Sequence, residues 1–136
     1  MRILVIDAQG GGIGRMLISE LRRSIPDADI TAVGTNSAAA SAMLKAGADR
    51  AATGENAVIV GCRRADVIVG PIGIVIADAM LGEVTAAMAA AVGSAEAERV
   101  LIPFQNCGSS IVGVTEKNTG RLVLEAVECI RQMAEK

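Results

Sequence analysis

The feature that most constrains this chain is a cluster of glycines directly after a short apolar run. Residues 2 to 8 are apolar and β-branched up to Asp7, which is typical of a buried strand. From Ile13 to Ile25 apolar residues recur every four positions, which predicts a helix that ends before Pro26. The turn between them consists of Gln9, Gly10, Gly11, Gly12, Ile13 and Gly14. The chain is therefore predicted to open with a strand, a tight turn and a helix.

This opening resembles the phosphate-binding start of Rossmann dinucleotide-binding proteins, whose pattern is Gly-x-Gly-x-x-Gly. Gly11 and Gly14 match the second and third glycines, and Gln9 replaces the first. In that family, backbone N–H groups approach a pyrophosphate at the positive N-terminus of the helix. The resemblance implies NAD or NADP, with the alternative that the glycines only form a tight turn.

The same resemblance predicts an acidic residue about twenty residues further on, where it would hold ribose hydroxyls. Here Thr35 and Asn36 follow the second predicted strand instead. Either side chain is suited to bind a ribose or a 2′-phosphate, and no arginine follows to neutralise that phosphate. The pattern therefore does not choose between NAD and NADP.

The remaining chain alternates between strand and helix patterns, with Asn36 or Ser37 expected to cap one helix and Gly47 to end it. Strands are expected at 30–33, 66–70, 99–104 and 111–114, with a weak one at 48–53, and helices at 38–46, 55–64, 75–92 and 118–134. Residues 105–110 are too few for a parallel crossover, so the last two strands are predicted to form an antiparallel hairpin. The predicted fold class is α/β: one Rossmann-like domain over residues 1–136, with a doubly wound, mostly parallel sheet and an antiparallel edge strand.

In such sheets ligands bind at the carboxyl ends of the parallel strands. Four segments are expected to meet there: 9–14, 34–36, 70–73 and 105–107. Pro71, Ile72 and Gly73 form a second turn before a helix, either to bind another anionic group or simply to reverse the chain.

Several mechanisms are excluded because the chain has no histidine, tyrosine or tryptophan, and Phe104 is its single aromatic residue. Catalysis by Ser-His-Asp or Cys-His groups, histidine zinc sites and a tyrosine acid or base are ruled out within the chain. The opening also resembles short-chain dehydrogenases, whose activity needs the missing tyrosine. Cys62, Cys107 and Cys129 lie far apart without a Cys-x-x-Cys pair, so neither disulfides nor a metal site are expected.

The charge balance indicates a protein without nucleic-acid or membrane partners. The 13 basic and 15 acidic residues leave a net charge of −2, which concentrates no polyanion. The first residues read as a strand rather than a signal peptide. Asp78 and Glu83 interrupt the most apolar stretch, residues 67–92, which makes it a poor membrane span. A cytoplasmic location is expected.

A few residues are candidates for chemistry. Asp78 is a carboxylate within the predicted apolar helix 75–92, and a solvated surface carboxylate is the favoured interpretation. Cys107 is a candidate nucleophile or an inert thiol. Glu55 and Asn56 are expected to reach the ligand or, preferably, to cap a helix. The apolar helix is also the expected homodimer interface, with burial inside the monomer as the alternative.

The whole chain resembles a small bacterial family that is described only as a conserved domain of unknown function. The segments that carry the resemblance include Gly-Thr-Asn at 34–36, Thr-Gly-Glu-Asn-Ala at 53–57 and Met-Leu-Gly-Glu-Val-Thr at 80–85. The resemblance implies no activity. The leading hypothesis is a binder of an NAD(P)-like, phosphate-bearing ligand, with catalysis left open. The alternative is a non-enzymatic, homo-oligomeric sensor or interaction module without a nucleotide.

Overall fold

The computed structural model describes residues 1–103, 108–116 and 118–136. The strands are β1 (Arg2–Asp7), β2 (Asp29–Gly34), β3 (Arg50–Thr53), β4 (Val67–Pro71) and β5 (Glu98–Ile102). The helices are α1 (Gly12–Ser24), α2 (Ser37–Ala46), α3 (Glu55–Arg64), α4 (Ala86–Gly93) and α5 (Thr119–Ala134), and the 3-10 turn η1 (Ile72–Val75) follows β4. Strand and helix alternate from the first residues, as the sequence predicts.

The strands form one sheet in the order β3-β2-β1-β4-β5, and every neighbouring pair is parallel. This is the order of the first five strands of a Rossmann fold, so the Rossmann-like α/β prediction is confirmed. The predicted antiparallel edge strand is wrong. The edge strand β5 follows a helical crossover through α4 and pairs in parallel with β4, from Glu98 to Ile102.

The second strand of the predicted hairpin does not form. Residues 111–114 make a turn, in which the N–H of Val114 donates to the carbonyl oxygen of Ile111 at 3.4 Å. Gly113 lies within it at φ 90°, a conformation that an extended strand does not contain. The apolar run is too short and too interrupted to add a strand.

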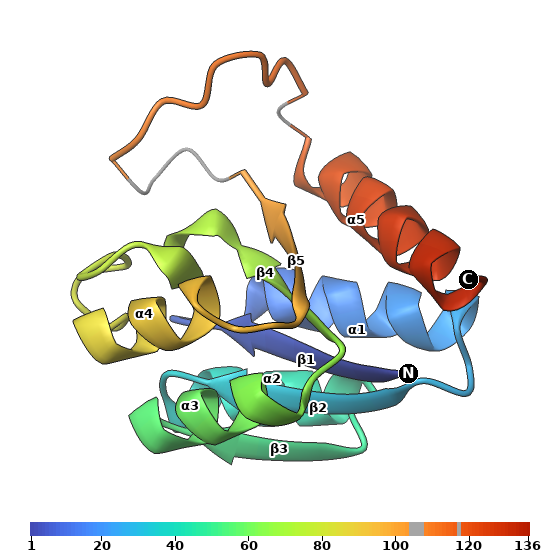
Figure 1. The fold of residues 1–136 in the computed structure, drawn as a ribbon, viewed down its shortest axis with the longest axis horizontal. Coiled ribbons are helices and arrows are strands. Elements are labelled where there is room, and N and C mark those ends of the chain that lie inside the picture. The colour runs from blue at the N-terminus through green and yellow to red at the C-terminus, as the bar shows by residue number, and fades with distance from the viewer. Residues whose placement is uncertain (104–107, 117) are drawn as a thin grey trace.

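Helices cover both faces of the sheet (Figure 1). The helices α1, α2 and α5 pack on one face, and α3 and α4 pack on the other. The chain steps outward from β1 to β3 along one face, then crosses back to place β4 beside β1. The switch in direction lies between β1 and β4, which is where sheets of this class bind ligands.

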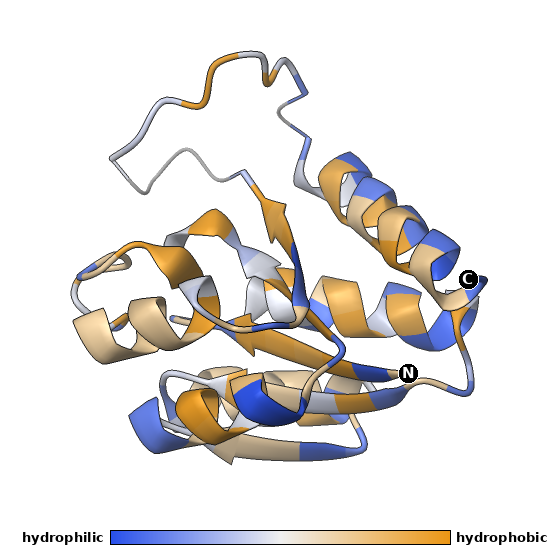
Figure 2. Cartoon of the chain, viewed as in Figure 1, coloured by the Kyte–Doolittle hydropathy of each residue, from blue (hydrophilic) through white to orange (hydrophobic). Residues whose placement is uncertain are grey.

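The central strand β1 is buried on both sides, which explains its continuous apolar sequence. Ile3 and Val5 contribute to the core beneath α1, while Leu4 and Ile6 contribute to the core beneath α3 and α4. All four side chains are at most 2% exposed. Apolar colour accordingly runs along the inner strands and the inward sides of the helices (Figure 2).

The long apolar helix predicted over residues 75–92 is wrong. The chain forms η1, then a series of turns, and then the short helix α4. Asp78, Met80 and Leu81 have φ between 56° and 66°, which no right-handed helix allows. Buried turns carry apolar residues just as helices do, since Ala79 and Val84 from this loop enter the core. Hydrophobicity alone therefore did not distinguish the two.

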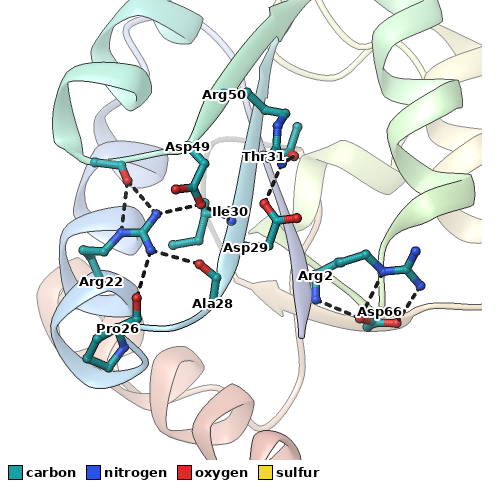
Figure 3. A network of polar contacts seen from close by, with 11 residues as sticks. Arg2, Arg22, Pro26, Ala28, Asp29, Ile30, Thr31, Asp49, Arg50 and Asp66 are labelled. Atoms are coloured by element: carbon teal, nitrogen blue, oxygen red, sulfur yellow. Dashed lines mark hydrogen bonds and ion pairs between the residues drawn. The ribbon is translucent and has the colours of Figure 1, made fainter.

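Polar contacts join residues at the amino ends of the strands (Figure 3). These ends lie opposite the glycine turn, which follows the carboxyl end of β1. Arg2 pairs with Asp66 at 3.1 Å, and Arg50 pairs with Asp29. Arg22 donates to the carbonyl oxygens of Pro26, Ala28 and Gly47 and to the carboxylate of Asp49. These contacts fix where the strands begin. No helix among the described residues is both long enough and apolar enough to cross a bilayer.

Candidate functional site

The glycine turn joins β1 to α1 at the switch point of the sheet, and two of its glycines are required by packing. Gly11 has φ 74°, and a Cβ there would lie 3.0 Å from the Cα and carbonyl oxygen of Ala39 in α2. A Cβ on Gly14 would lie 2.4 Å from the sulfur of Met43. The two glycines that match the dinucleotide pattern therefore have a structural reason to be glycine, namely the close approach of α1 and α2.

Gly10 and Gly12 have no such reason. Both are exposed, and a Cβ built on either would meet no neighbouring atom within 4 Å. Neither has the positive φ that only glycine adopts easily. Within the described part of the chain, their N–H groups donate to no protein acceptor. The turn therefore presents open backbone to the carboxyl edge of the sheet.

Asp7 closes the turn from below with a buried carboxylate. Its Oδ1 accepts the N–H of Ala8 at 2.8 Å, and its Oδ2 accepts the N–H of Gly14 at 2.7 Å. Burial raises the pKa of Asp7, the N–H donors oppose the rise, and the negative charge of Glu83 adds to it. An anionic group of the protein itself is thus bound at the start of α1.

Glu83 joins three of the predicted site residues. Its Oε1 accepts the backbone N–H of Gln9 at 2.9 Å, the hydroxyl of Thr35 at 2.7 Å and the side-chain amide of Asn36 at 2.7 Å. These donors hold the pKa of Glu83 below its ordinary value, the Gln9 N–H most strongly. The turn after β1 and the end of β2 therefore meet around a carboxylate from the loop after β4.

Asn36 has two structural roles in this arrangement. Its Oδ1 accepts the N–H of Ala39 at 2.9 Å and caps α2, as the sequence predicts. Its Nδ2 donates to Glu83 and also to the carbonyl oxygen of Gln9 at 3.0 Å. Gln9 itself has φ 51°, and its N–H donates to the carboxylate of Glu83.

The second predicted turn lies deeper in the protein than the first. Pro71 is the buried last residue of β4, Gly73 is buried and Ile72 is partly exposed. A Cβ on Gly73 would lie 2.7 Å from the terminal methyl of Met80, so this turn supports the loop that carries Glu83. The helix expected after it is the four-residue turn η1. Binding of a ligand by these residues stays a prediction.

Among the described residues, Asp78 and Glu55 form no hydrogen bond with Glu83, Thr35 or Asn36. Asp78 is exposed in a turn rather than set in an apolar helix. Glu55 begins α3 without capping it, and its Oε1 instead accepts the hydroxyl of Thr85 at 2.6 Å. Residues 105–107, including Cys107, lie outside the described residues.

Surface hollows occur elsewhere on the protein. One of about 740 Å³ lies between α3 and α4 and is lined by Arg2, Cys62 and Asp66. Burial raises the pKa of Cys62 to about 11, which keeps this thiol protonated and unreactive. A second hollow of about 420 Å³ lies beside α3, over the start of β1, β2 and β3. Both lie toward the amino edge, away from the glycine turn.

Sequence reasoning missed both carboxylates of the site. Asp7 is a charged residue at the end of a buried strand, and that position was a usable signal. Glu83 is one of two carboxylates in an apolar stretch, but nothing local connects it to residues 35 and 36, which lie nearly fifty positions away. The described groups of the site are hydrogen-bonding groups, namely carboxylates, a hydroxyl, an amide and backbone N–H groups, and none of them is an activated nucleophile.

Comparison with known proteins places the chain in a family. A family profile matches residues 2–135, which is nearly its whole length. The chain belongs to DUF3842, a domain of unknown function. This confirms the expectation of a family without an assigned function.

Among solved structures, the DUF3842 chain is similar to a dodecameric FMN-dependent UbiX-like decarboxylase from Escherichia coli O157:H7. The TM-score is 0.47 and the identity 18%, and the similarity covers 98% of this chain and 76% of that one. A search of curated proteins finds no match. At this identity and TM-score, no ligand is inferred from the similarity.

Proposed function

We propose that this chain binds a nucleotide-like ligand across the carboxyl ends of β1 and β2, with a phosphate on the exposed turn. The observation that carries the proposal is the difference between the glycines. Gly11 and Gly14 are explained by packing, whereas Gly10 and Gly12 stand open with N–H groups that have no acceptor in the described structure. A glycine that packing within the protein does not require leaves the backbone uncovered, and a ligand can then approach the backbone N–H groups closely.

The position of Asp7 narrows where the phosphate binds. Because its carboxylate already accepts the N–H of Gly14, the phosphate belongs on the outer part of the turn, at Gly10 and Gly12. Thr35 and Asn36 are held beside this turn because both donate to Glu83, which also accepts the N–H of Gln9. The proposed site thus combines a phosphate subsite at 10–12 with the neighbouring polar cluster that Thr35 and Asn36 form with Glu83.

The test is a thermal-shift screen with NAD, NADH, NADP, FMN, ATP, coenzyme A and inorganic phosphate. The blocking variant is Gly12→Ala, because its Cβ has room in the free protein and would meet a bound phosphate. Gly93→Ala is the matched control, since Gly93 is also a helical glycine with open space, at the end of α4. Gly11→Asp is unsuitable because its side chain would collide with Ala39.

A ligand that raises the melting temperature of the wild type and of Gly93→Ala, but not of Gly12→Ala, supports the proposal. A folded wild type that responds to none of these compounds would sink it.

A homo-oligomeric interaction module is the second candidate, and exposed apolar side chains favour it. Val112 is 98% exposed on a segment that extends away from the helices and sheet, and Leu81 is 95% exposed in the loop before α4 (Figure 1). Light scattering on wild type and Val112→Ser tests it. A wild-type dimer that the substitution dissociates supports this function, and a monomeric wild type opposes it.

A further inference from the structure

Glu83 uses its two carboxylate oxygens very differently. Oε1 accepts the Gln9 N–H, the Thr35 hydroxyl and the Asn36 amide, all within 2.9 Å. Within the described residues, Oε2 accepts no hydrogen bond. The side chain is partly exposed, so this second oxygen is accessible from the carboxyl edge of the sheet. A carboxylate oxygen with free lone pairs can only accept hydrogen bonds.

The loop that carries Glu83 is held in place by the protein. The N–H of Asp78 donates to the carbonyl oxygen of Val84 at 2.7 Å, and the N–H of Val84 donates to Ala79 at 3.2 Å. Ala79 and Val84 are 8% and 1% exposed within the core. Met80 and Leu81 are kept in left-handed conformations that cost energy unless the surroundings enforce them. Glu83 is therefore positioned before any ligand arrives, which favours a binding role.

We propose that Glu83 selects the sugar of the ligand: its Oε2 accepts a hydroxyl of a ribose or ribityl group, and its charge rejects a phosphate on that hydroxyl. This inference rests on the proposed function. It assigns to the loop after β4 the acidic residue that the end of β2 lacks. Thr35 and Asn36 then act as positioning residues, because they donate to Glu83 rather than to the ligand.

The negative charge of Glu83 decides whether the proposed site prefers a hydroxyl or a phosphate on the sugar. Three donors stabilise the ionised form of Glu83. A ligand with an additional phosphate next to Oε2 would add negative charge beside this carboxylate, whereas a hydroxyl would donate a charge-assisted hydrogen bond to it. The site should therefore prefer NAD to NADP and ADP to 2′-deoxy-ADP.

The deciding variant is Glu83→Gln. The amide oxygen of the glutamine can still accept from Gln9, Thr35 and Asn36. An NH₂ group takes the place of Oε2, so a hydrogen-bond acceptor becomes a donor while the contacts of the loop are kept. Glu55→Gln is the matched control, because it removes the same charge from the carboxyl end of β3, where Glu55 contacts Thr85 instead. Urea unfolding of each variant shows whether the fold is kept.

Calorimetric titrations with NAD, NADP, ADP, 2′-deoxy-ADP and FMN provide the test. We expect the wild type and Glu55→Gln to bind the hydroxyl-bearing member of each pair about tenfold more tightly. Glu83→Gln should lose that preference, bind NADP more tightly than the wild type does and bind FMN about tenfold less tightly.

The outcomes separate this inference from the proposed function. If the wild type binds a probe and Glu83→Gln retains the same preference, Glu83 does not select the sugar, and the proposed site still stands. If Glu55→Gln changes the preference as much as Glu83→Gln does, the effect is one of general charge, and the inference is overturned. If the wild type binds none of the probes, both are overturned.

Discussion

Asp7 and Gly14 are joined by a hydrogen bond of 2.7 Å, from the backbone N–H of Gly14 to Oδ2 of Asp7. The bond ties the last residue of β1 to the first turn of α1, and Oδ1 of the same carboxylate accepts from Ala8. Asp7 is 4% exposed, so its charge is compensated by backbone dipoles rather than by water. The protein therefore supplies its own anion at the helix start.

We predict that Asp7→Asn lowers the free energy of unfolding by about 1–2 kcal/mol at neutral pH. An asparagine has one acceptor oxygen for two N–H donors, so its NH₂ group would face one of them. Urea unfolding measures the loss. Asp27→Asn, at an exposed position before β2, is the control and should change stability by less than about 0.5 kcal/mol. Equal stability of wild type and Asp7→Asn would contradict the assigned role.

The same pair predicts a pH dependence. Burial raises the pKa of Asp7 in the folded protein above its ordinary value of 3.8. The folded state therefore holds the proton more tightly than the unfolded state, and the contribution of Asp7 to stability falls as the pH rises through its folded pKa. The difference in unfolding free energy between wild type and Asp7→Asn should shrink from acid pH toward neutrality. A difference that grows over this range would show a lowered pKa instead.

The glycine turn predicts opposite effects at neighbouring positions. Gly11→Ala should cost about 1–3 kcal/mol, because it forces a left-handed alanine against Ala39. Gly12→Ala should be neutral or stabilise by up to about 1 kcal/mol, because it has room and restricts the unfolded chain. Thermal and urea unfolding of both variants check this. Similar losses at both positions would mean that Gly12 also has a packing role.

The contacts of Arg22 lead us to expect a large loss of stability from a conservative substitution. Its guanidinium contacts three carbonyl oxygens and Asp49, whereas among the described residues Arg23 pairs only with Glu20, and its side chain is 75% exposed. Arg22→Lys should lower the unfolding free energy by about 1–3 kcal/mol, because a single ammonium group cannot reach all the acceptors that surround the planar guanidinium group. Arg23→Lys should cost less than about 0.5 kcal/mol. Equal effects in urea unfolding would disprove the distinction.

The backbone conformation of Leu81 leads us to expect that a substitution at this position stabilises the protein. Leu81 has φ 59° and is 95% exposed, so its conformation is costly and its side chain buries little. Leu81→Asn should raise the unfolding free energy by up to about 1 kcal/mol, because asparagine tolerates the left-handed region better. Leu124→Asn, in the middle of α5, should instead lower it by about 0.5 kcal/mol through helix propensity. Thermal unfolding shows whether the two substitutions change stability in opposite directions. Destabilisation by Leu81→Asn would show that the leucine side chain itself contributes to stability at this position.

Local patterns predicted most of the elements. The alternation of short apolar runs and helical spacing placed β1 and α1 within one residue of their observed ends. Asn36, one of the two expected caps, begins α2, and Gly47 ends it as expected. The errors lie where tertiary contacts overrode the local signal. Residues 75–92 are apolar because Ala79 and Val84 enter the core from turns, and β5 is parallel because α4 carries the chain back.

The amino-acid sequence by itself determined the α/β class and the position of the glycine turn, because strand and helix periodicities and glycine conformations are local properties of the chain. Only the tertiary structure decided which glycines are required by packing and which are open. It also brought Glu83 to Thr35 and Asn36, since that contact depends on β4 returning beside β1. Contacts between residues so distant in sequence leave no periodic signal, because they exist only once the strands have paired.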